Sequence, residues 1–245
     1  MNASKQMASA IIQQSTSNVE ALMRLFEADG LPGRTAAQRL RWILRVTASG
    51  LPGMQMALFP PDDSGFKEEL ADGRFYFSRL YWAKLVKPER RNTSQMGHFL
   101  IAVGLRVTPW PRTVALRLIV GHEKLGDGLF FGFVRQYLRA TAEDRRLFME
   151  AVDHDQAGRS RQRDLALRKI FGEPGEARRD PRRIGNSVPD LRLSVKGWRF
   201  GQAIAERRLQ TRAEAAAWLR REIYDPGRPR QPVPAPAEPE TNRAE

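Results

Sequence analysis

The residues of this sequence most able to do chemistry are three histidines, and their spacing matches no catalytic or metal-binding motif. His98, His122 and His154 lie too far apart to give the two-histidine helical spacing of a zinc hydrolase. Asp153 and Asp155 flank His154 and could bind a divalent cation, but this cluster ends a predicted helix, which favours a solvated polar cap. We therefore expect a protein that is not an enzyme and holds no metal or other cofactor.

Two further kinds of active site are excluded by composition and residue order. Segment 121–128, GHEKLGDG, superficially looks like a phosphate-binding loop, but Lys124 precedes the second glycine instead of following the last one. The chain has no cysteine, which excludes disulfides, thiolate nucleophiles, zinc fingers and iron–sulfur clusters.

Positive charge is the strongest chemical signal in the sequence. The 245 residues include 41 basic and 28 acidic side chains, a net charge of +13 with a pI near 10.9. Segment 158–222 holds 17 basic and 8 acidic side chains. Only seven of the basic residues are lysines, and arginine grips phosphate with paired hydrogen bonds, although a GC-rich genome gives the same bias. We expect a nucleic-acid partner, with duplex DNA favoured and RNA open.

Helix signals dominate the remaining pattern. Capping boxes, in which a Ser or Thr and a Glu or Gln three residues later satisfy free backbone N–H groups, lie at 17–20, 35–38 and 211–214. Arg41 and Arg45 lie one turn apart, away from the apolar face of the second of these helices. The expected fold class is mainly α, a multi-helical body with a small basic C-terminal module.

We expect five segments along the chain. They are a flexible N-terminus (1–16), a helical body (17–157), a basic helix and linker (158–190), a basic nucleic-acid-binding module (191–224) and a disordered, proline-rich tail (225–245). The aromatic-rich run 74–91 is either core or a binding surface. No apolar run is long enough for a signal peptide or a membrane span, which predicts a cytoplasmic protein with no membrane partner.

The basic helix and linker supply the first set of predicted phosphate contacts. Proline and glycine interrupt the linker, which either orders on phosphate or remains a solvated surface loop. The predicted contacts in this segment are Arg161, Arg163, Arg178, Arg179, Arg182 and Arg183.

Strict alternation of apolar and polar residues predicts a short strand at 191–196. Its inward side chains would be Leu191, Leu193 and Val195, and its outward ones Arg192, Ser194 and Lys196. A helix at 198–208, a tight turn and the helix that begins with the capping box at 211–214 are expected to follow. A plain helix-turn-helix, or a helical pair packed on the body, are the alternatives.

This order of strand, helix, turn and helix resembles the ribbon-helix-helix family of DNA-binding proteins, in which two chains pair their strands into a ribbon that enters the major groove. The resemblance implies a homodimer that reads bases through its outward strand residues and holds phosphate at the second helix. Leu209 replaces the usual turn glycine, and Gly201 replaces a usual core leucine. The predicted nucleic-acid contacts of the module are Arg192, Ser194, Lys196, Arg199, Thr211 and Arg212.

Together these patterns predict a non-enzymatic DNA-binding protein, a repressor or an accessory factor in replication, partition or transfer of a mobile element. The alternative is a subunit of a multiprotein ribonucleoprotein, such as an RNA-guided (CRISPR-type) effector complex, whose body docks on partner proteins.

Overall fold

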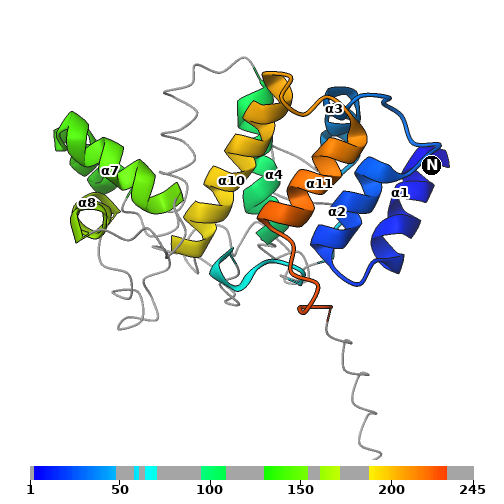
Figure 1. The fold of residues 1–245 in the computed structure, drawn as a ribbon, viewed down its shortest axis with the longest axis horizontal. Helices are drawn as coiled ribbons and strands as arrows, with labels where there is room; N and C mark the ends of the chain where they lie inside the picture. The colour runs from blue at the N-terminus through cyan, green and yellow to red at the C-terminus, as the bar shows by residue number, and fades with distance from the viewer. Residues whose placement is uncertain are drawn as a thin grey trace, which may run out of the picture.

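The computed structural model describes residues 3–47, 58–60, 64–70, 95–108, 130–153, 161–171 and 188–230, and within these ranges the chain is mainly helical, as expected. The only β pairing there is two isolated bridges. The helices are α1 (Ala3–Gln14), α2 (Asn18–Glu27), α3 (Ala36–Thr47), the 3₁₀ helix η1 (Glu68–Leu70), α4 (Gln95–Val107), α6 (Phe130–Arg139), α7 (Ala142–Asp153), α8 (Arg161–Phe171), α10 (Val188–Ala205) and α11 (Arg212–Glu222). From one end to the other, Figure 1 shows α8 and α7, then α10 and α4, then α11 and α3, then α2 and α1.

The capping boxes begin helices where they were predicted. At α11 the Thr211 hydroxyl accepts from the Glu214 N–H, and the Glu214 carboxylate accepts from the Thr211 N–H at 2.8 Å. Thr35 and Gln38 form the same reciprocal pair before α3. At α2 only half of the predicted box forms: the Ser17 hydroxyl accepts from the Glu20 N–H, but the Glu20 carboxylate accepts from the Thr16 N–H at 2.7 Å. All three predicted helix starts are nevertheless confirmed, because a cap depends only on neighbours within one turn.

The predicted strand at 191–196 is wrong, because these residues lie inside α10. Leu191, Leu193 and Val195 are buried, as the alternation indicated, but Ser194 between them is buried as well. Helices α4, α7, η1 and α11 all pack against α10, so its apolar residues do not need to keep to one helical face. A six-residue alternation cannot distinguish a half-buried strand from a helix that is surrounded by neighbours.

Two glycines one turn apart let α10 lie directly against α4. An added Cβ at Gly197 would stand 2.3 Å from the carbonyl oxygen of Phe99, and one at Gly201 would stand 3.1 Å from the carbonyl oxygen of Val103. Gly201, which departs from the ribbon-helix-helix pattern, therefore has a packing reason of its own.

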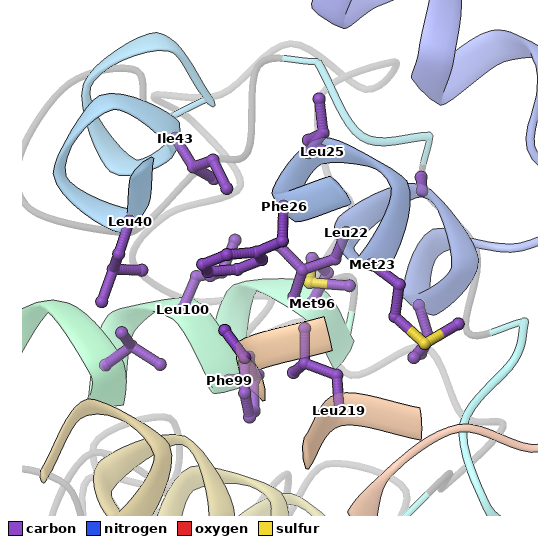
Figure 2. Packing of buried hydrophobic residues seen from close by; sticks show 14 of the residues in the cluster. Leu22, Met23, Leu25, Phe26, Leu40, Ile43, Met96, Phe99, Leu100 and Leu219 are labelled. Carbon is purple, nitrogen blue, oxygen red and sulfur yellow. The ribbon is translucent and has the colours of Figure 1, made fainter. Parts of the chain in front are cut away.

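The segments predicted as helical body and C-terminal module share one hydrophobic core. Figure 2 shows Phe26 of α2, Phe99 of α4 and Leu219 of α11 in the same cluster of buried side chains. The ring of Phe200 on α10 lies 5.6 Å from that of Phe26, 5.7 Å from that of Phe99 and 5.0 Å from that of Trp218 on α11. Helices α10 and α11 thus form part of the body's core.

The N-terminal segment differs from the flexible arm that was expected. Residues 3–14 form α1, and Ala8, Ile11 and Ile12 are buried against the core. The spacing i, i+3, i+4 places these three side chains on one face of a helix, which explains why a segment with few apolar residues still packs.

The first residues of the predicted disordered tail are also held in place. The Arg230 N–H donates to the Thr16 carbonyl oxygen at 2.5 Å, and its guanidinium donates to the Ser15 carbonyl oxygen and to Asn18 Oδ1 at 3.2 and 3.1 Å. Proline excludes helix here, but it does not prevent side-chain and carbonyl hydrogen bonds to other parts of the fold. Residues 231–245, the linker at 172–187 and the aromatic run at 74–91 lie outside the described residues.

Candidate nucleic-acid interface

The three predicted base-reading residues are not brought together by α10. Ser194 is buried, with 3% of its surface exposed. Lys196 is half-buried and its Nζ lies 3.0 Å from Glu222 Oε2 on α11. On a helix, Arg192 and Lys196 share one face, whereas Ser194 points to another. In this fold the set cannot act as the outward face of a strand.

The predicted phosphate seat at the start of α11 is used by the protein itself. Arg212 donates to the Ala28 carbonyl oxygen and to Asp29 Oδ1, each at 2.9 Å, which ties α11 to the end of α2. The Glu214 carboxylate accepts from the N–H of Thr211, and this hydrogen bond is the main cause that lowers its pKa. A carboxylate thus occupies the position that a phosphate would need, and it repels a second anion.

The remaining predicted contacts have different environments. Arg161 on α8 and Arg199 on α10 are exposed. Arg163 is half-buried and pairs with Glu150 of α7 at 3.0 Å. The four linker residues Arg178, Arg179, Arg182 and Arg183 lie outside the described residues.

Many basic side chains in the described part of the chain face carboxylates. Ion pairs of this kind reduce the local positive field and leave fewer donors for phosphate. They involve Arg106, Arg146, Lys169, Arg208, Arg220 and Arg221.

A row of exposed arginines along α3 is different, and only Arg41 and Arg45 of this row were evident from the sequence pattern. Arg41 and Arg45 share a helical face with Gln38, and all three are exposed. Arg34 precedes the helix, is exposed, and donates its N–H to Gln38 Oε1 at 3.0 Å, which places it at the start of the same row. None of the three arginines forms an ion pair with another described residue. Continuing the helical spacing back from Arg41 past the capping box would have found Arg34.

A buried arginine on the opposite side of α3 fixes the position of this row. Arg39 is fully buried and its guanidinium donates only to backbone carbonyl oxygens. Those carbonyls end α2 and form the loop before α3, where an α-helix leaves its last acceptors unpaired. Burial, together with the nearby Arg212, lowers the pKa of Arg39 to about 10, against a smaller opposite effect of Asp29. The accepting residues are Leu25, Phe26, Ala28, Leu31 and Pro32.

Comparison with known proteins identifies no family for this chain. A scan against family models gave no match, and searches among curated proteins and solved structures gave none either. Within the described ranges, no three His, Asp or Glu side chains gather closely enough to hold a metal ion. No helix in those ranges combines the length and apolar character that crossing a bilayer requires.

Proposed function

We propose that the chain is a non-enzymatic DNA-binding protein whose arginines contact the phosphate backbone. The observation that carries the proposal is the row of exposed arginines along α3, which have no acidic partner among the described residues, in a chain of net charge +13. Phosphate neutralises such charges and releases condensed counterions, which supplies most of the affinity of basic proteins for DNA. Repression, or an accessory role in replication, partition or transfer of a mobile element, requires binding of this kind without catalysis.

The exposed arginines at Arg161 and Arg199 offer additional phosphate contacts on α8 and α10. The linker arginines between these helices remain predicted contacts. Contacts to phosphate hold the protein on the duplex without selecting a sequence, and selection requires side chains that reach base edges.

Fluorescence anisotropy across a salt series tests the proposal, with random duplex DNA, single-stranded DNA and an RNA hairpin as ligands. Three phosphate contacts give a slope of roughly −2.7 in log K against log salt, a loss of roughly fortyfold between 50 and 200 mM. A steep slope with preference for the duplex is the expected result. Equal binding to all three ligands would instead support the ribonucleoprotein subunit, and no binding in low salt would contradict both functions.

A further inference from the structure

Two helices of this fold have related sequences. Residues 35–45 read TAAQRLRWILR and residues 211–221 read TRAEAAAWLRR. Both begin with the capping threonine, carry Gln or Glu three residues later, and place tryptophan at the eighth position. Each follows a helix and a loop, since α2 leads into α3 and α10 leads into α11.

The two related segments meet at their equivalent residues. Thr35 pairs with Thr211 in an antiparallel bridge, and the Ala36 N–H donates to the Gln210 carbonyl oxygen at 2.8 Å. Antiparallel pairing of a residue with its own counterpart is the contact that a local two-fold axis produces. The correspondence is confined to this contact, because α11 packs extensively against α2 whereas α10 touches α3 only slightly.

Equivalent positions of α3 and α11 are apolar where both helices pack into the core. Ile43 and its counterpart Leu219 are both buried. Leu40 and its counterpart Ala216 are buried as well. These residues serve the common core of α2, α3, α4, α10 and α11. Packing thus explains the apolar resemblance between α3 and α11.

The exposed positions differ in a way that packing does not explain. Where α3 has Arg34, Gln38 and Arg41, α11 has Gln210, Glu214 and Ala217, and all six are exposed. The three arginines of α11, Arg212, Arg220 and Arg221, each form an ion pair with a carboxylate. Among the described residues, α3 thus presents exposed arginines that form no ion pair, while the arginines of α11 are all neutralised.

We infer that α3 is the helix that lies in the major groove of duplex DNA, and that α11 is its non-binding counterpart, an inference that rests on the proposed function. An α-helix with side chains is about 10–12 Å wide, which suits a major groove about 12 Å wide. Arg34, Arg41 and Arg45 then face phosphates along the groove. The Oε1 of Gln38 accepts backbone N–H groups, so its amide NH₂ points donors at base acceptors.

A helix that binds in a major groove favours duplex DNA over RNA, and the position of the arginine row predicts how many chains bind each site. A-form RNA has a deep, narrow major groove that does not admit a helix, so duplex DNA is the occupant of this surface. Because the whole arginine row lies on one helix of one chain, one chain is sufficient for one site. Binding as a monomer replaces the homodimer that the ribbon-helix-helix resemblance implied.

The test gives α3 the exposed residues of α11. The variant Arg34→Gln/Gln38→Glu/Arg41→Ala lowers the net charge by three and keeps a Thr-x-x-Glu capping box, which α11 already uses. A control variant with the same charge change, Arg146→Ala/Arg208→Ala/Arg221→Ala, removes arginines that face exposed or half-buried carboxylates.

Anisotropy titrations with random duplex DNA compare the wild type with both variants. We expect the α3 variant to bind roughly tenfold more weakly or worse, with a salt slope smaller by about two. The control should remain within about twofold of the wild type. Sedimentation of the complex should give one chain per short duplex.

Each other result overturns the inference in a recognisable way. If the wild type binds duplex DNA and both variants bind equally well, the inference fails while the proposed function stands. Binding that prefers the RNA hairpin also refutes it, and a wild type that binds no nucleic acid refutes inference and function together. If the α3 variant does not fold, Arg41→Glu/Arg45→Glu, which leaves the cap untouched, is measured in its place.

Discussion

Replacing Gly197 with alanine should destabilise the protein, although alanine is the better helix former. In an open helix interior the change stabilises by about 0.5–1 kcal/mol. At this position the new Cβ would stand 2.3 Å from the Phe99 carbonyl oxygen and 3.2 Å from the Ala102 Cβ. Both belong to α4, and the carbonyl is backbone, so α10 and α4 must separate along their shared face.

The magnitude follows from these two opposing effects. Overpacking of this kind costs about 1–3 kcal/mol and sometimes more, and a backbone oxygen at 2.3 Å belongs at the upper end of that range. After the helix-propensity gain is subtracted, we expect a loss of about 2 kcal/mol in the free energy of unfolding. For a chain of this size that lowers the Tm by about 4–8 °C.

Gly104→Ala on α4 is the matched control. A Cβ there meets nothing within 4 Å, so only the propensity gain remains. Its Tm should rise by roughly 2–3 °C. Thermal and urea unfolding followed by circular dichroism measure both variants. The packing argument is wrong if Gly197→Ala is as stable as the wild type, or if the two variants shift the Tm in the same direction.

Three further substitutions test other contacts of the fold. Arg39→Leu leaves the carbonyls at the end of α2 without donors and should lower the free energy of unfolding, measured by urea denaturation, by at least about 3 kcal/mol. A loss under about 1 kcal/mol would contradict the stabilising role of the Arg39 hydrogen bonds. Thr211→Ala should remove about 1 kcal/mol with the cap, whereas Thr211→Ser should retain most of it in the same assay. Burial raises the pKa of Glu222, but hydrogen bonds from Arg221 and Lys196 outweigh it and lower the pKa overall. The resulting stability is present above the ordinary carboxyl pKa and is lost as pH falls through the lowered value. Glu222→Gln should therefore be less stable than the wild type at neutral pH and converge with it in acid, and a constant difference across pH would refute this.

Local signals carried the correct part of the fold prediction. The capping boxes located the starts of α2, α3 and α11 because each depends on residues within one turn. The strand at 191–196 failed because its alternation was produced by burial on several sides. That burial comes from α4, α7, η1 and α11 together, and α4 approaches closely only because residues 197 and 201 lack side chains. Nothing within the six residues of the alternation carries this information.

For the candidate site, too, part could be predicted from the sequence and part depended on the tertiary structure. Sequence alone determined the helical class, the capping residues and the sign of the surface charge. The tertiary structure decided which cations are neutralised: Arg220 meets Glu27 and Lys196 meets Glu222, while the row that begins at Arg34 faces solvent. Arginine density pointed to 158–222, yet the unpaired row lies on α3. Ion pairing depends on distances between residues far apart along the chain, and only folding sets those distances.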